Sequence, residues 1–192
     1  MQNKQQPFWP DNSIYFLTGS TFLHYPYFRE WKQKQIILNQ FKKIRAELGI
    51  PVSAYSISIN HYHAKFYLEK GIYLSKVKQL IHGGTSFYYK NKYKPKYEEI
   101  WQDSKTIIIT SEEMNWKVDG YTDGNLLKHK EVNTFQELKE NPFSSFKYRA
   151  EKYGDEFARN LVRGVIITEE DSEGEVDMGK LQKIKIDLPN RG

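Results

Sequence analysis

The sequence predicts a single domain of the α+β class, on three observations. The chain has 192 residues, of which 39% are hydrophobic and 15% aromatic, which suits one buried core but not two large domains. Some segments repeat their apolar residues every second position, as strands do, and others at helical spacing. These strand-like and helix-like segments follow one another in the order β-α-β-β-α-β-α.

The first half of the chain predicts a strand, a helix and a pair of strands. Residues 14–21 are rich in aromatic and β-branched side chains, which favour a strand. From Arg29 the apolar residues recur at helical spacing, and Gly49 ends this helix. Residues 52–68 are of strand type, and Ser58-Ile59-Asn60 predicts a tight turn that divides them into two antiparallel strands.

The next segments complete the predicted sheet. A second amphipathic helix is expected from Leu74 to about Tyr89, running through Gly83 and Gly84. Residues 105–110 then predict a fourth strand. The element order is that of a ferredoxin-like (RRM-like) antiparallel sheet with helices on one face, followed by an added C-terminal helix.

That added helix is expected over residues 111–130. Thr110 and Glu113 stand in the relation of a capping box, which marks the start of a helix. Gly120 and Gly124 lie inside it, and each costs about 1 kcal/mol relative to alanine. The helix is therefore expected to be kinked or to be held by packing.

The chain divides into three parts on composition. We expect an N-terminal extension over 1–13, one folded domain over 14–164, and an acidic linker and tail over 165–192. A further helix is predicted near 156–162. Residues 181–188 alternate apolar and polar side chains, which predicts either an added strand or a tail that docks on a partner.

Composition excludes several kinds of site. The chain has no cysteine, so disulfides, thiolate metal sites and cysteine nucleophiles are absent. It has no glycine-rich phosphate loop and no Gly-x-Ser-x-Gly elbow, and no nucleotide cofactor is expected. The 29 basic residues exceed the 24 acidic ones, which suits a polyanionic partner. Since neither a signal peptide nor a membrane span is apparent, we expect a cytoplasmic protein without a membrane partner.

A histidine pair could bind a metal ion. His61 and His63 fall two apart in a predicted strand, so both imidazoles point to one face and can reach one cation. Two histidines leave a metal undercoordinated, so a third ligand must come from elsewhere. The alternative is a pair of half-exposed strand histidines without a metal.

Tyr121 and Asn125 lie four apart on the predicted third helix and therefore share a face. The phenol oxygen could act as a nucleophile, and the amide oxygen could be the missing metal ligand. Because the chain has 14 tyrosines, the alternative is that Tyr121 is an ordinary packing residue.

Residues 87–97 interleave tyrosines with lysines. Aromatic rings can stack on unpaired bases while ammonium groups neutralise phosphates, so this segment could hold single-stranded nucleic acid. The alternative is a solvated basic loop. The DNA-binding candidates in and near this segment are Lys78, Tyr88, Tyr89, Lys90, Lys92 and Lys94.

Seven segments match one known family in the same order over about residues 14–150. They are Tyr15–Thr21, Pro26–Phe28, Ala54–His63, Leu74–Ser86, Ile100–Gln102, Gly120–Asn125 and Pro142–Phe146. Taken together they resemble the single-tyrosine HUH transposases of small bacterial insertion sequences and the REP-associated tyrosine transposases.

The resemblance implies roles for particular residues. His61 and His63 would bind a divalent metal, Mg²⁺ or Mn²⁺, with Tyr62 packing away from it, and Asn125 would be the third ligand. Tyr121 would be the nucleophile. Asp123 stands where relatives often have His, and it is a candidate for an additional metal ligand.

The resemblance also implies a reaction and its partners. Such enzymes cleave and rejoin single-stranded DNA through a 5′-phosphotyrosine, commonly next to a DNA hairpin. Many form homodimers in which the tyrosine helix of one chain completes the site of the other, so a homodimer is one arrangement to test. Two other functions stay open: a domesticated, non-catalytic protein that binds hairpin or single-stranded nucleic acid, and a replication or mobilisation HUH nickase.

Overall fold

Four strands form the central sheet of the computed structural model, which describes residues 9–168 and 177–186. The strands are β1 (Ser13–Thr21), β2 (Val52–Ile57), β3 (His61–Leu68) and β4 (Trp101–Ile109). They lie in the order β2-β3-β1-β4, and each neighbouring pair is antiparallel. This is the strand order of a ferredoxin-like sheet, so the predicted fold class is confirmed, as is the turn between β2 and β3.

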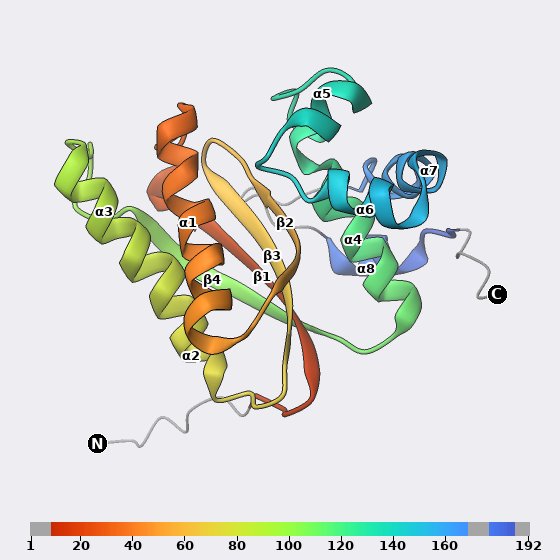
Figure 1. Cartoon of the computed structure of the whole chain (residues 1–192), viewed down its shortest axis with the longest axis horizontal. Coiled ribbons are helices and arrows are strands. Elements are labelled where there is room, and N and C mark those ends of the chain that lie inside the picture. Colours follow the sequence, from red (N-terminus) through yellow and green to blue (C-terminus); the bar gives the residue numbers. More distant parts are fainter. Residues whose placement is uncertain (1–8, 169–176, 187–192) are drawn as a thin grey trace.

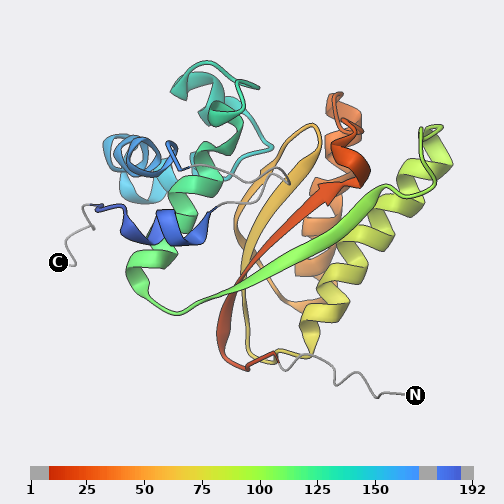
Figure 2. The same cartoon turned by 180° about the vertical axis from the view of Figure 1, so that it is seen from behind.

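One face of the sheet is covered by two long helical segments that run side by side (Figures 1 and 2). Gly83 and Gly84 do not break the second segment, as predicted; the chain instead passes through one π-helical turn. The segments are α1 (Trp31–Leu48), and α2 (Tyr73–Lys78), η2 (Gln79–Gly83) and α3 (Gly84–Lys92) in succession.

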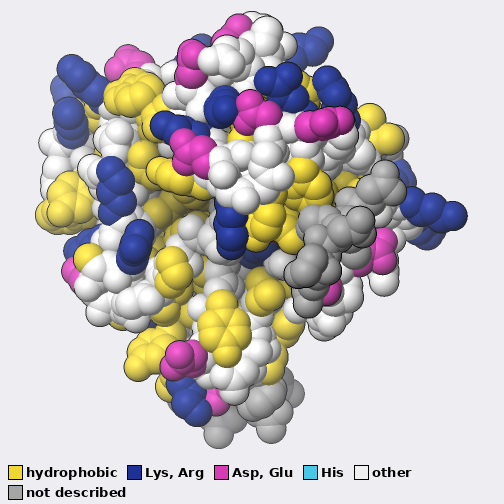
Figure 3. Space-filling model, turned by 45° about the vertical axis from the view of Figure 1, so that its right-hand side comes forward, with side chains coloured by type: hydrophobic (Ala, Val, Ile, Leu, Met, Phe, Trp, Pro, Cys, Tyr) yellow, Lys and Arg dark blue, Asp and Glu magenta, His cyan; other side chains and the backbone are white. Residues whose placement is uncertain are grey.

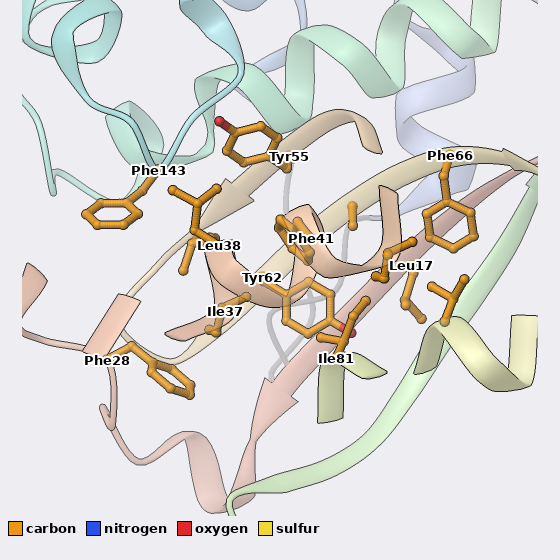
Figure 4. Packing of buried hydrophobic residues seen from close by; sticks show 14 of the residues in the cluster. Leu17, Phe28, Ile37, Leu38, Phe41, Tyr55, Tyr62, Phe66, Ile81 and Phe143 are labelled. Carbon is orange, nitrogen blue, oxygen red and sulfur yellow. The ribbon is translucent and has the colours of Figure 1, made fainter. Parts of the chain in front are cut away.

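The main core lies between this face and the two helical segments. The even-numbered side chains of β3, from Tyr62 to Leu68, point into it and are fully buried. Figure 4 shows Tyr62 and Phe66 among apolar side chains that include Ile37 and Phe41 of α1. Strand periodicity therefore directs alternate residues of β3 to opposite faces of the sheet.

The opposite face is covered by the C-terminal helices (Figure 1). The first of them, α4, starts one residue later than predicted, because Ser111 and not Thr110 caps it by accepting a hydrogen bond from the Met114 amide at 3.1 Å. These helices are α4 (Glu112–Lys128), α5 (Phe135–Glu140), α6 (Phe146–Tyr153), α7 (Asp155–Val165) and α8 (Met178–Lys183).

The two glycines of α4 allow α7 to approach closely. A Cβ atom on Gly120 would lie 2.8 Å from the Leu161 carbonyl oxygen, and one on Gly124 would collide with the Val162 side chain. The helix itself is continuous over its 17 residues. Packing against α7 therefore accounts for both glycines, and the expected alternative of a kink is not seen.

The C-terminal part differs from its prediction. Residues 178–183 form helix α8 and not a strand, and Leu181 is fully buried against α4. The expected acidic linker falls largely on residues 169–176, and the end of the expected strand on 187–192; both lie outside the described residues. No helix in the described ranges is long and apolar enough to cross a membrane.

Candidate active site

The histidine pair lies on β3, on the face of the sheet that α4 covers. His61 and His63 are both buried, and their ring centroids are 5.1 Å apart. Tyr62, between them, points into the core on the other face and makes a 2.8 Å hydrogen bond to His82 Nε2. The predicted shared face is confirmed, whereas the alternative of two half-exposed histidines is not seen.

Neighbouring side chains orient both imidazoles. Asn60 Nδ2 donates to the His24 carbonyl, so Asn60 Oδ1 faces His61 at 2.9 Å and accepts a hydrogen bond from Nδ1–H. His63 Nδ1 pairs with the Thr18 hydroxyl, also at 2.9 Å. Each ring therefore uses its Nδ1 atom in a hydrogen bond, which leaves Nε2 as the coordinating atom.

Asn125 of α4 completes the group. Its Oδ1 atom lies 3.0 Å from His61 Nε2, so two lone pairs face each other when Nδ1 of His61 carries the proton. The Nε2 atom of His63 is also buried and has no hydrogen-bond partner among the described residues. Two ligands that are about 2.1 Å from a hard cation and at right angles lie about 3.0 Å apart. The separation of His61 Nε2 and Asn125 Oδ1 therefore fits a shared divalent cation, which would also give the buried Nε2 atom of His63 a partner.

Burial keeps both imidazoles neutral. It lowers the pKa of His61 to about 3 and the pKa of His63 well below its usual range, and nearby His129 contributes to both shifts. A metal binds the neutral form of imidazole, so neither ring has to lose a proton first. No group of three His, Cys, Asp or Glu side chains in the described ranges could hold a metal, so a cation here depends on the Asn125 amide.

Tyr121 of α4 lies beside the same histidines. Its ring centroid is 5.3 Å from that of His63, and Lys128 Nζ lies 4.9 Å from the centre of the tyrosine ring. Tyr121 and Lys128 are seven residues apart on α4 and therefore share a face with Asn125. The side chain is buried, with 1% of its surface exposed. The structure thus brings the predicted nucleophile and the three predicted ligands together within one chain.

The structure does not bring Asp123 to this group. Its carboxylate accepts a 2.6 Å hydrogen bond from Arg149 Nε and another from the Ser145 hydroxyl, which ties α4 to α6. Two residues from Tyr121 on a helix, it points away from the histidine pair and toward Ser145 and Arg149. The expectation of Asp123 as an additional ligand is therefore wrong for this conformation, because both of its oxygens are already engaged.

The candidate DNA-binding residues lie on the other side of the sheet, on α2, α3 and the loop that follows. Tyr89 is buried against Tyr27 and Phe28, with ring centroids 5.3 and 5.7 Å away, so it is a core residue and cannot stack on a base. Lys78 is half-buried, with its ammonium 5.7 Å from the centre of the Trp9 ring. The exposed members of the set are Tyr88, Lys90, Lys92 and Lys94.

His129 belongs to the site but was missed from the sequence. Its ring centroid is 4.8 Å from that of His61, and its backbone amide donates to the Asn125 carbonyl at the end of α4. It follows Asn125 by four residues and Tyr121 by eight. Helical spacing extended by one more turn would have identified it.

The fold has a counterpart among solved structures. The structure of a REP-associated tyrosine transposase bound to a REP hairpin superposes with a TM-score of 0.59, covering 91% of this chain and 98% of that one at 18% identity. That likeness shows a shared fold. A candidate transposase from Deinococcus radiodurans R1 matches 62% of this chain and 94% of its own at 11% identity with a TM-score of 0.45, too distant to support an argument. No protein-family model and no curated protein matches the chain.

Proposed function

We propose that this chain is an HUH-type tyrosine transposase, which cuts and rejoins single-stranded DNA with Tyr121 as the nucleophile. The observation that carries the proposal is the convergence of Tyr121, His61, His63 and Asn125 from a strand and a helix that are far apart in the sequence. Two of these contacts join α4 to β3 within one chain. The shared fold with a hairpin-bound tyrosine transposase supports the same conclusion.

Each residue has a defined part in the proposed reaction. His61, His63 and Asn125 would hold Mg²⁺ or Mn²⁺, which when bound polarises a non-bridging oxygen of the scissile phosphate. The Tyr121 oxygen attacks the phosphorus: its bond to phosphorus forms, the bond to the 3′ oxygen breaks, and the phenol proton ends on the released 3′-hydroxyl. The ammonium of Lys128 lies over the Tyr121 ring, 4.9 Å from its centre, where a cation and an aromatic face attract each other.

The proposed substrate is single-stranded DNA beside a hairpin. The basic composition of the chain suits this polyanion, and the structural neighbour is bound to a REP hairpin. Because α4 packs on the sheet of its own chain, we propose that one chain supplies all four residues of the site. A homodimer with exchanged helices stays a prediction.

The test uses a labelled DNA hairpin library with randomised single-stranded flanks, incubated with Mn²⁺ and run on a denaturing gel. Wild type should give a protein-linked DNA product. Tyr121→Phe should abolish that product, whereas Tyr73→Phe, a change at an exposed tyrosine on α2, should not. His61→Ala should also abolish it while hairpin binding is kept. A product from Tyr121→Phe equal to that of wild type would refute the nucleophile assignment.

One observation favours a second candidate, a protein that binds hairpin or single-stranded nucleic acid without cutting it. Tyr121, His61 and His63 are all buried, and Tyr121 shares its apolar cluster with Leu181 of α8, so a phosphate can reach these residues only if a covering element shifts. A binding protein predicts hairpin affinity that is equal with and without divalent metal, and no covalent product. The same gel, together with a binding titration in EDTA, distinguishes the two functions.

A further inference from the structure

A cavity of about 340 Å³ lies on the same face of the sheet as the histidine pair. It is bounded by the end of β3, the first turns of α4, and α6. Lys65, which lines it, follows His63 by two residues on β3, a distance of about 7 Å along a strand. The cavity is therefore the neighbour of the candidate active site, and it contains none of the residues assigned to that site.

The rim of the cavity is aromatic and exposed. Tyr67, Tyr148 and Tyr153 line it, with 47%, 62% and 37% of their surfaces exposed. Tyr153 packs edge-on against Trp116, whereas Tyr148 is the most exposed of the three rings. On the surface that Figure 3 shows, hydrophobic side chains lie among basic and acidic ones. Exposed aromatic rings with basic side chains beside them suit nucleic acid, whose bases are flat and whose backbone is anionic.

The floor of the cavity is polar but balanced in charge. Lys65 and Arg149 are buried and form ion pairs with Asp119, and Arg149 also pairs with Asp123. The Asn115 amide oxygen accepts from Lys65 at 2.6 Å. Because two cations face two carboxylates, the floor has no excess charge for a free anion or a metal ion. It does offer both hydrogen-bond donors and acceptors, as the edge of a heteroaromatic ring requires.

Tyr148 lines two neighbouring cavities. The second, also of about 340 Å³, is lined by Lys42 and Arg45 of α1 as well. The exposed ring is therefore shared by both cavities, with Lys152 at the first and two more cations at the second. A single strand could cross here with a base against each face of the ring while lysine and arginine side chains contact its phosphates.

We propose that the first cavity binds a nucleobase of single-stranded DNA, stacked on Tyr148 with its edge toward Asn115 and the buried ion pairs. The site would position the strand that enters the catalytic group. The identity of the ligand as substrate DNA rests on the proposed function, whereas the capture of an unpaired base does not.

The test measures binding in EDTA, where no cleavage can occur. The probes are a short fluorescein-labelled oligothymidylate and the same strand with abasic sites, read by fluorescence anisotropy. Tyr148→Ala should weaken oligothymidylate binding about tenfold, the effect of losing one stacked base. Tyr148→Phe, which keeps the ring, and Tyr73→Ala, at another exposed tyrosine, should bind like wild type. Binding of the abasic strand should not respond to Tyr148→Ala.

Two results would overturn this proposal. The first is that Tyr148→Ala and Tyr73→Ala bind oligothymidylate with equal affinity. The second is that Tyr148→Ala weakens binding of the abasic strand as much as binding of oligothymidylate, which would mean that Tyr148 contacts the DNA backbone. The covalent-product gel, run on the same proteins, separates this outcome from failure of the proposed function. If wild type forms the covalent product but Tyr148→Ala binds oligothymidylate like wild type, the proposed function stands and the base site is refuted. If Tyr148→Ala weakens oligothymidylate binding but wild type forms no covalent product, the base site stands and the proposed function is refuted.

Discussion

The two faces of the sheet are built from the same strands but hold together by different forces. The even-numbered residues of β3, 62–68, are apolar or aromatic and fill the core under α1 and α3. The odd-numbered residues 61–65 are two histidines and a lysine, and they are buried as well. The first face is stabilised by removing apolar area from water, which is favourable without any partner geometry. The second face is stable only while its charges and lone pairs are matched.

Protein cores rarely bury as many polar groups as the α4 face does. Each such group loses its hydration on burial, and this loss must be offset by a hydrogen bond or an opposite charge. On the α4 face Asp119 shows the cost: burial raises its pKa, although Arg149 and Lys65 oppose the shift. The comparison indicates that the α1 face is the main source of stability and that the α4 face keeps polar groups buried at the proposed site. Four experiments test this division between the two faces.

The largest effect is expected from Phe66→Ala. Phe66 is fully buried and stacks on Tyr15, so the change should lower the free energy of unfolding by about 4 kcal/mol. The control is Tyr67→Ala, one residue on, on the other face and 47% exposed, which should cost less than about 1 kcal/mol. Urea denaturation measures both. Equal losses would mean that the α1 face is not the main source of stability.

The next largest effect is expected from Arg149→Leu on the α4 face. It leaves the buried carboxylates of Asp119 and Asp123 with Lys65 alone and should cost about 3 kcal/mol. Lys147→Leu, at an exposed i,i+4 pair on the same helix, should change stability by less than about 0.5 kcal/mol. If both substitutions are neutral in urea denaturation, matched charges do not hold this face together.

A pH effect of intermediate size is expected from His82, a polar residue on the otherwise apolar face. Burial, and then nearby Lys78, lowers the pKa of His82 to about 4, below its ordinary value of 6.5. Its contribution is therefore complete above pH 6.5 and is lost as the pH falls, by up to about 2 kcal/mol between pH 7 and pH 5. The curve for His82→Gln should be flatter than that of wild type. Parallel curves from pH 7 to pH 4 would contradict this.

The smallest effect tests the layer behind the α4 face. Gly120→Ala gains about 1 kcal/mol of helix propensity but places a methyl group 2.8 Å from the Leu161 carbonyl oxygen, so a net loss of about 1 kcal/mol is expected. Gly83→Ala, where the nearest atom is 4.0 Å away, should instead stabilise by up to about 1 kcal/mol. Thermal melts should therefore shift in opposite directions, and a rise for both would remove the packing role of Gly120.

The sequence predicted what depends on local periodicity. Alternation along residues 61–63 placed both imidazoles on one face, and a spacing of four placed Tyr121 and Asn125 on one side of a helix. The strand order followed from the order of elements. These features need only near neighbours, and the structure agrees with them.

Contacts between residues far apart in the sequence could not be predicted from local sequence patterns. The interaction of Lys65 with Asp119 joins residues 54 positions apart (119 minus 65), so no spacing rule reveals it, and the cavity beside it was also missed. Tyr89 was misjudged because an aromatic residue among lysines has the same pattern whether its ring faces solvent or Tyr27. Asp123 was misjudged because Arg149, which engages it, lies on another helix.

The strand that carries the histidines has paired strands on both sides, whereas α4 is attached to the sheet by side chains. Amide protons of β3 should therefore exchange with deuterium only when the whole domain opens, and those near the end of α4 should exchange earlier. The two imidazoles are then held on the more rigid element of the candidate site, and Tyr121 and Asn125 on the less rigid one. Under the proposed function, access to the site depends on the helices that cover it, α4 and the α8 segment packed on it, and deuterium uptake there would report that motion.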